Sequence, residues 1–164
     1  MRPELDQKLV RKYPKIFAQR HLPPSQTAMC WGFDCGDGWY DLLDTLCETI
    51  QDHIDWSNCD GKHEDARKWR EPEADGTWIR VRQLEAAQVK EKFGGLRFYT
   101  NGGDDFTRGA INFAELLSLR VCETCGAPGR PQKGGWIRTL CPTHAEEAGY
   151  APRAGGKEDK GEED

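Results

Sequence analysis

The chain of 164 residues is long enough for one domain with its own hydrophobic core and a small additional module. Hydrophobic residues make up 37% and charged residues 31%, and no apolar run is long enough to predict a membrane span or a signal peptide. The net charge of −5 argues against indiscriminate nucleic-acid binding, which needs a basic domain. We therefore expect a reducing, intracellular setting, where the seven cysteines favour metal binding over a disulfide framework.

The charges are segregated along the chain. Residues Asp34–Asp75 hold thirteen acidic side chains against four basic ones, a net −9, whereas residues 1–33 carry +4 and Gly76–Thr100 and Arg120–Leu140 carry +3 each. An acidic centre beside basic flanks is either self-complementary or presents two faces of opposite sign to partners.

The first half of the sequence predicts two helices. Glu4–Lys12 has apolar residues on one side, and Pro14 ends this helix before an irregular stretch around Pro23. A second helix follows Asp37, which we expect to cap it, because a carboxylate suits a helix N-terminus. Its apolar stripe comprises Leu42, Leu43, Leu46, Cys47, Ile50 and Ile54.

The middle of the chain predicts a loop followed by strands. Ser57–Thr77 is polar and acidic and indicates a long loop, and Thr77–Gln83 alternates as a strand does. The stretch QVKEKFGGLRFYT predicts a β-hairpin with its turn at Gly94-Gly95. A helix that ends at Gly94 is the competing interpretation of Gln88–Phe93.

The last third predicts a helix, a metal site and a tail. The helix runs from about Phe106 to Leu119, with Asp104 or Asp105 as its cap. Its inward residues are expected to be Ala110, Phe113, Ala114 and Leu117. We expect an α+β fold in which helices pack on a small antiparallel sheet. The expected divisions are a core domain over 1–119, a Cys₃His zinc-finger or zinc-ribbon module over 120–149 packed on that core, and a disordered acidic tail over 150–164.

Four residues at the C-terminal end have the spacing of metal ligands. Cys122-x-x-Cys125 is followed after fifteen residues by Cys141-x-x-His144. A two-residue gap lets both ligands of a pair reach one tetrahedral ion, and Gly126 supplies the positive φ that such a knuckle needs. Four protein ligands leave no open coordination position, so the pattern predicts a structural Zn²⁺.

Other chemistry-bearing residues have weaker patterns. Cys30, Cys35, Cys47 and Cys59, with His53 or His63, could form a second metal site, although Cys47 fits a buried core thiol better. A nucleophilic cysteine is disfavoured because acidic and aromatic neighbours raise a thiol's pKa. An aspartate group around the second helix could collect Mg²⁺, but a cap followed by a solvated face explains it better. Its members are Asp34, Asp37, Asp41, Asp44 and Asp52, together with His53. The stretch His63–Asp65 matches no catalytic motif.

Basic and aromatic residues occur together in the hairpin and in the Cys/His segment. Outward cations beside aromatic planes suit phosphates and bases as well as an acidic protein surface. The alternative is that the aromatics are core residues and the cations are either solvated or paired with the acidic centre. The candidate binding surface comprises Lys90, Lys92, Arg97, Tyr99, Trp136 and Arg138.

Three blocks of sequence resemble a family of small proteins encoded by bacteriophages and prophages. The blocks are MCWGFDCGDGWYDLLDTLC, VKEKFGGLRFY and CETCGAPG…GGWIRTLCPTHA, and the resemblance covers about Tyr13 to Ala145. It implies a viral origin and a location in the cytoplasm of a bacterial host, and it supports the zinc ligands named above. It implies no activity.

These observations lead to a functional hypothesis with two alternatives. The leading one is a non-enzymatic accessory protein that binds a host macromolecule, most simply a protein, in counter-defence or host takeover, and that has no membrane partner. One alternative is a sponge for a nucleotide signal, with Arg97, Tyr99, Trp136 and Arg138 around the ligand. The other is a nucleic-acid-binding zinc protein that acts in transcription regulation.

Overall fold

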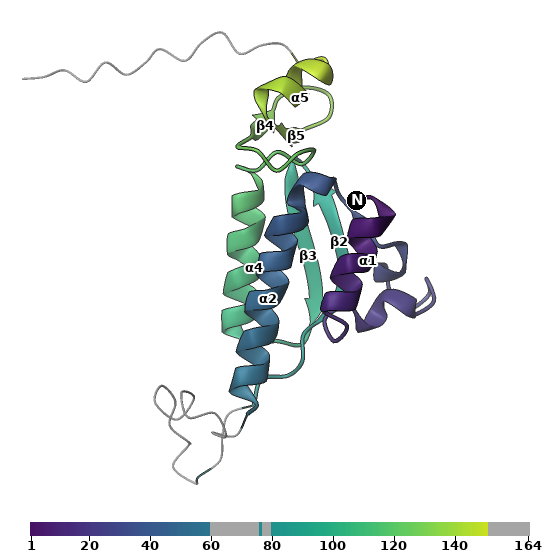
Figure 1. Ribbon diagram of the computed structural model, residues 1–164, viewed down its shortest axis with the longest axis vertical. Helices are drawn as coiled ribbons and strands as arrows, with labels where there is room; N and C mark the ends of the chain where they lie inside the picture. Colours follow the sequence, from purple (N-terminus) through teal and green to yellow (C-terminus); the bar gives the residue numbers. More distant parts are fainter. Residues whose placement is uncertain (60–75, 77–79, 151–164) are drawn as a thin grey trace, which may run out of the picture.

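The computed structural model describes residues 1–59, 76 and 80–150. Its helices and strands form a body with a small Cys/His segment at one end (Figure 1). The helices are α1 (Pro3–Lys12), α2 (Tyr40–Ser57), α4 (Asp105–Ser118) and α5 (Pro142–Glu147); the strands are β1 (Phe33–Asp34), β2 (Glu85–Lys92), β3 (Gly95–Asn101), β4 (Arg130–Gln132) and β5 (Arg138–Leu140).

The main sheet is mixed, in the order β1-β2-β3. β2 and β3 pair antiparallel as a hairpin. The strand prediction for Gln88–Phe93 is therefore confirmed for the residues that lie in β2. The alternative of a helix that ends at Gly94 is wrong. β1 pairs parallel to β2, with Phe33 opposite Val89. The expected α+β class is therefore correct, but a purely antiparallel sheet is not.

The hairpin turn lies one residue earlier than predicted. Lys92 pairs with Gly95, which leaves Phe93 and Gly94 as a two-residue loop with φ of 54° and 78°. Two consecutive left-handed residues match the right-handed twist of a hairpin. Gly94 adopts this conformation freely, whereas a bulky residue such as Phe93 does so at an energetic cost.

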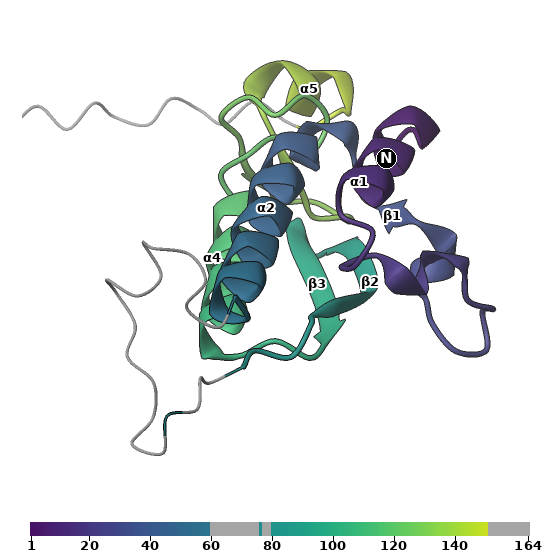
Figure 2. The ribbon, with the colours of Figure 1, turned by 60° about the horizontal axis from the view of Figure 1, so that its bottom comes forward.

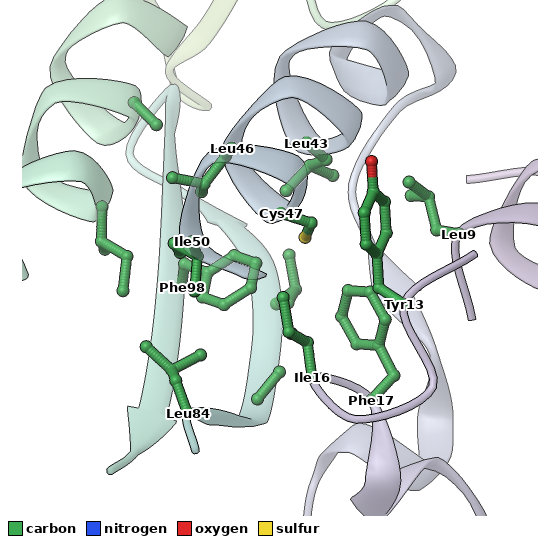
Figure 3. Packing of buried hydrophobic residues seen from close by; sticks show 14 of the residues in the cluster. Leu9, Tyr13, Ile16, Phe17, Leu43, Leu46, Cys47, Ile50, Leu84 and Phe98 are labelled. Carbon is green, nitrogen blue, oxygen red and sulfur yellow. The ribbon is translucent and has the colours of Figure 1, made fainter. Parts of the chain in front are cut away.

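The core lies between the helices and the sheet. α2 and α4 run side by side, and α4 lies along β3 (Figures 1 and 2). The apolar stripe of α2 is buried as predicted, apart from a partly buried Leu42, and it meets side chains of the N-terminal segment and of β3 (Figure 3). Each fully buried aliphatic side chain contributes about 1.5–3 kcal/mol. The labelled core residues are Leu9, Tyr13, Ile16, Phe17, Leu43, Leu46, Cys47, Ile50, Leu84 and Phe98.

The start of α2 differs from the prediction. A short 3₁₀ turn over Asp37–Trp39 precedes the helix, which begins at Tyr40 with no side-chain cap. The carboxylate of Asp37 instead accepts hydrogen bonds from the backbone N and the Nε of Arg2, at 2.7 and 2.6 Å. Asp37 therefore ties the N-terminal segment to the turn before α2, and the N-cap prediction is wrong.

Side chains of α4 satisfy the outer edge of β3. The backbone N of Leu96 donates to Ser118 Oγ at 2.8 Å, and the backbone N of Phe98 donates to Glu115 Oε1 at 2.9 Å. An unpaired strand N–H group costs free energy when it is buried, and it can pair with another chain when it is exposed. This requirement fixes which side of α4 faces the sheet.

The orientation of α4 corrects the predicted inward face. The buried residues of this helix are Thr107, Ile111, Ala114 and Ser118. Ala114 is therefore correct and Ala110 is partly buried, but Phe113 is 67% exposed and Leu117 is 37% exposed. The cap prediction is confirmed for Asp104, which forms a capping box with Thr107.

The segment before β2 is irregular where the structure describes it. Residues 80–83 form no strand, contrary to the prediction for Thr77–Gln83. The side-chain amide of Asn58 instead pairs with both backbone groups of Val81, at 2.9 and 3.0 Å. Most of the predicted Ser57–Thr77 loop and of the predicted tail lies outside the described residues. Among the described helices, none combines the length and the hydropathy that crossing a bilayer requires.

The cap of α4 generates a pH-dependent prediction. Asp104 also contacts His53 Nε2 at 2.7 Å. Burial opposes its ionisation, but hydrogen bonds from Thr107 and His53 outweigh this and lower the pKa of Asp104. Its stabilising effect is thus complete above its unfolded pKa and is lost as pH falls through the lower folded pKa.

Asp104→Ala should lower the free energy of unfolding by about 1–2 kcal/mol at pH 7, and the difference should shrink at low pH. Urea denaturation at pH 7 and in acid measures both values. Glu48→Ala is the control, since Glu48 is an exposed acidic residue on α2. An Asp104→Ala deficit that persists unchanged in acid would contradict this account.

Candidate metal centre

The four predicted ligands converge on one point. One ligand atom from each of Cys122, Cys125, Cys141 and His144 lies within 4.8 Å of the other three. In the described part of the chain, this is the one cluster of cysteine, histidine and acidic residues that is arranged to hold a metal ion. Its cysteines form no disulfide.

The distances between the ligand atoms fit a tetrahedral ion. Cys125 Sγ and Cys141 Sγ are 3.9 Å apart, and Cys122 Sγ lies 3.6 Å from His144 Nδ1. Zinc-ligand bonds of about 2.3 Å to sulfur and 2.0–2.1 Å to nitrogen give tetrahedral edges of roughly 3.8 and 3.5 Å. The Cys141 Sγ to His144 Nδ1 distance is shorter, at 3.1 Å. Three sulfurs and one imidazole nitrogen can therefore hold a metal ion, with His144 coordinating through Nδ1.

Short local structures position the four ligands. The first pair lies on a knuckle in which Gly126 N donates to Cys122 O at 2.8 Å, and Gly126 has the expected positive φ of 80°. Strands β4 and β5 then form a hairpin, and Cys141 directly follows β5. α5 carries His144 on its first turn, so a knuckle, a hairpin and a helix end surround the site.

The backbone around the site favours a thiolate at Cys122. Burial opposes its ionisation, but backbone N–H groups that donate to its sulfur outweigh this and lower the pKa of the Cys122 thiol to about 6. These groups belong to Cys141, Cys125 and Thr124. The Ala127 backbone N–H also favours the thiolate of Cys125, but burial and hydrogen bonds within the cysteine cluster raise its pKa overall. Thiolates are the form that binds metal.

The metal-ligand segment is joined to the core through Glu123. Its backbone O accepts from Gly38 N at 2.8 Å, and its Oε1 accepts from Gly36 N at 2.9 Å. Its backbone N donates to Thr139 O at 2.9 Å, which adds the β5 hairpin to the same connection. Glu123 is only 7% exposed, so these bonds lie inside the junction.

Further contacts close the junction on both sides. Trp39 Nε1 donates to Val121 O at 2.9 Å, and Thr139 Oγ1 donates to Gly94 O at 2.6 Å. The segment thus contacts the turn before α2 and the tip of the β2–β3 hairpin. These contacts join the segment to the core, while the division of the chain at residues 120–149 stays a prediction.

Gly38 allows the closest approach of the two parts. A Cβ at this position would lie within 3.0 Å of backbone atoms of Cys122, Cys125 and Gly126. Backbone atoms cannot move aside as the end of a flexible side chain can. The turn before α2 therefore needs glycine because the metal knuckle rests directly on it.

The predicted binding-surface residues divide into two groups. Lys90, Arg97 and Tyr99 belong to the β2–β3 hairpin, where Lys90 pairs with Arg97 and Lys90 Nζ lies 5.5 Å from the Tyr99 ring centre. Arg97 Nη1 donates to Leu96 O at 2.7 Å and lies 3.9 Å from Glu115. The Arg97 guanidinium is thus engaged at the β3 edge.

The second group lies where the hairpin tip meets the metal-ligand segment. Lys92 Nζ lies 5.4 Å from the Phe93 ring centre, and Arg138 Nε lies 3.5 Å from Glu123. Trp136 is 69% exposed, and Tyr150 donates a 2.5 Å hydrogen bond to its backbone O. The nucleotide pocket that needs both arginines to converge stays a prediction.

Two exposed residues beside this second group are absent from the predicted binding surface. Phe93 is 69% exposed at the hairpin tip, and Ile137 is 40% exposed. A Cβ at Gly94 would lie 3.0 Å from Ile137 Cγ2. The β2–β3 turn and the loop before β5 therefore contact each other at these two residues. We name the side chains of Phe93, Trp136 and Ile137 the hairpin-tip patch. In the sequence, the hairpin-tip patch is indicated by a large aromatic residue, Phe93, directly before Gly94 in a predicted hairpin turn.

The remaining cysteines and the aspartate group of the sequence analysis have structural roles or contacts in the described part of the chain. Burial raises the pKa of Cys35 to about 12 and raises the pKa of Cys47 even further. Cys30 Sγ contacts Thr27 O, and no metal cluster includes Cys59 within the described ranges. Asp44 accepts hydrogen bonds from Lys12 and Tyr13, as Asp37 does from Arg2. His63–Asp65 lies outside the described residues.

A comparison with protein-family models, with curated proteins and with solved structures finds no match. The resemblance to phage and prophage proteins therefore stays a prediction. The site has to be interpreted from its own geometry.

The metal site can be tested by stoichiometry. The purified chain should bind one Zn²⁺, and Cys125→Ser should weaken binding by at least roughly 100-fold, because the serine hydroxyl is a poor replacement for thiolate. Competition with a chromophoric chelator measures the affinity. Cys30→Ser is the control and should leave the affinity unchanged. Equal zinc affinity in all three proteins would contradict the assigned ligands.

The junction can be tested at Gly38. Gly38→Ala should lower the free energy of unfolding by about 1–3 kcal/mol, because the added methyl group meets fixed backbone. It should also weaken zinc retention, although Gly38 is no ligand. Gly135→Ala is the matched control, since a Cβ at Gly135 meets nothing within 4 Å. Thermal denaturation with and without chelator measures both effects, and equal behaviour of the two variants would exclude the proposed contact.

Proposed function

We propose that this protein is a binding protein that uses the hairpin-tip patch to contact a protein of a bacterial host. A zinc ion at the Cys₃His site acts as structural support in this proposal. The observation that carries the proposal is the exposure of three large apolar side chains, Phe93 and Ile137 beside Gly94 and Trp136 next to Ile137 in the chain.

The patch has the composition of a binding hot spot. Tryptophan and other large apolar residues dominate the energetics of protein interfaces, usually inside a polar rim. Phe93 and Trp136 are each 69% exposed, and Lys92 and Arg138 lie beside them in the chain. This arrangement suits an apolar pocket with acidic residues around it.

The turn conformation supports a role for Phe93 in binding. Asparagine or glycine at this position would relieve the cost of its positive φ, on the order of 1 kcal/mol. Phe93 gives little packing in return, since it is 69% exposed and its ring is approached by the Lys92 ammonium at 5.4 Å. Local strain with little compensating contact is typical of functional positions.

Zinc is the ion that best explains the ligand set. Three thiolates and one imidazole favour Zn²⁺ over the hard cations, which prefer oxygen. Four protein ligands complete a tetrahedral shell and leave no position for a substrate. The ion would hold together β5, α5 and the knuckle, and thereby fix the backbone that presents Trp136.

A nucleic-acid partner is the second candidate, favoured by the pairing of Lys90 with Tyr99 and of Lys92 with Phe93. Aromatic rings beside cations stack with unpaired bases and contact phosphates. The net charge of −5 weighs against this candidate. A host nucleotide signal is a less favoured ligand, because Arg97 and Arg138 are both engaged elsewhere.

The test compares two exposed tryptophans. Trp136→Ala should abolish capture of the partner from a bacterial host lysate, and Trp31→Ala should not. Trp31 is the matched control because it is 75% exposed and lies before β1, whose register with β2 places it away from the hairpin tip. Quantitative mass spectrometry of the captured proteins measures the difference.

Phe93→Asn separates binding from stability in the same experiment. It should keep or raise the melting temperature while weakening capture, because asparagine favours the turn but removes the ring. Nuclease treatment should leave capture intact if the partner is a protein, and added salt should weaken capture much less than it would weaken a nucleic-acid complex. Capture that depends on nucleic acid would support the second candidate, and equal capture by all variants would overturn the role of the patch.

A further inference from the structure

α4 has a second apolar line that faces away from the core. Phe106, Phe113 and Leu116 are 50, 67 and 59% exposed, and Leu117 is 37% exposed. At 3.6 residues per turn, this line lies roughly a third of a turn from the buried line that includes Ile111 and Ser118. We name the exposed side chains of Phe106, Phe113, Leu116 and Leu117 the α4 stripe.

We propose that the α4 stripe is the interface of a homodimer in which α4 packs antiparallel against α4 of a second copy, with the twofold axis near Phe113. This proposal is independent of the hairpin-tip patch. α4 lies at one side of the molecule, with α2 and β3 on its inner side (Figures 1 and 2).

In this arrangement, large side chains of one α4 lie opposite small side chains of α4 in the second copy. A twofold axis at Phe113 places Leu117 opposite Gly109 of the second copy, and Leu116 opposite Ala110. A Cβ at Gly109 would meet nothing within 4 Å, so this position is an open hollow on the stripe. Large residues opposite small ones are how two antiparallel helices interlock.

The charges at the two ends of α4 also fit an antiparallel pair. Asp105 is at the first turn, and Arg120 follows the last turn. Within the ranges that the structure describes, Arg120 has no ion-pair partner in its own chain. Within its own chain Asp105 pairs with Arg108 and Phe106 stacks on the His53 ring, but the Asp105 side chain is 97% exposed and Phe106 is 50% exposed, so both stay accessible. The twofold arrangement places each Arg120 beside these two residues of the other copy, where both an ion pair and a cation–π contact can form. A parallel arrangement would place like charges together.

The area is sufficient to form the centre of a dimer interface. The exposed fractions of the α4 stripe correspond to on the order of 400 Å² of apolar surface, if a large side chain exposes about 200 Å² in full. A standard interface buries about 800 Å² on each partner, with a polar rim that supplies the remainder. A patch of this size lies within the range of the largest apolar patch on a typical monomer, and such patches are often functional.

The experiment is sedimentation equilibrium of the full zinc-loaded chain up to roughly 100 μM. The mass should approach twice 18.6 kDa, and Phe113→Glu should weaken dimerisation by at least roughly tenfold. Gly109→Leu should do the same by filling the hollow, while circular dichroism shows an unchanged fold. Trp31→Glu, a charge at an exposed aromatic outside α4, is the matched control and should dimerise normally.

A charge exchange tests the antiparallel register. Arg120→Asp should weaken the dimer, and the double variant Asp105→Arg with Arg120→Asp should restore it. A wild-type chain that stays monomeric would mean that a different partner covers the stripe, and it would overturn the proposal. So would a dimer that Phe113→Glu and Gly109→Leu leave intact. A dimer that the double variant fails to restore would overturn the antiparallel register.

Discussion

The contact between the turn before α2 and the metal knuckle is the constraint on which the arrangement of this protein depends. Gly36 and Gly38 let the knuckle backbone rest directly on the turn, and buried Glu123 hydrogen-bonds to both glycines. The same turn holds Asp37, which pairs with Arg2. The N-terminal segment, α2 and the metal centre therefore share one short stretch of backbone, so a disturbance of the metal centre acts on the main fold.

Sequence patterns were sufficient where the deciding interactions are local. The ligand spacing predicted the metal centre, because two residues between cysteines define a knuckle without any distant contact. The apolar stripe of α2 and the alternation of β2 were equally informative. Asp104 was recognisable as a cap because the helix that it precedes begins one residue later.

Most of the wrong predictions have long-range causes, and the hairpin turn has a local one. α4 carries two apolar lines, and periodicity alone favoured the line with Phe113. The structure buries the other line because the backbone of β3 needs Ser118 and Glu115 as hydrogen-bond acceptors. The parallel pairing of β1 joins Phe33 to Val89, and the turn at Phe93 requires a conformation that phenylalanine rarely adopts. Sequence spacing carries no information on such contacts.

The satisfied edge of β3 has a consequence for how any partner can approach. Many recognition domains add a peptide as an extra strand, which needs a row of free backbone N–H groups at the sheet edge. Here Ser118 and Glu115 already occupy the N–H groups of Leu96 and Phe98. Along this part of the sheet, a partner must therefore be recognised through side chains, and the same protection keeps the strand from seeding edge-to-edge aggregation.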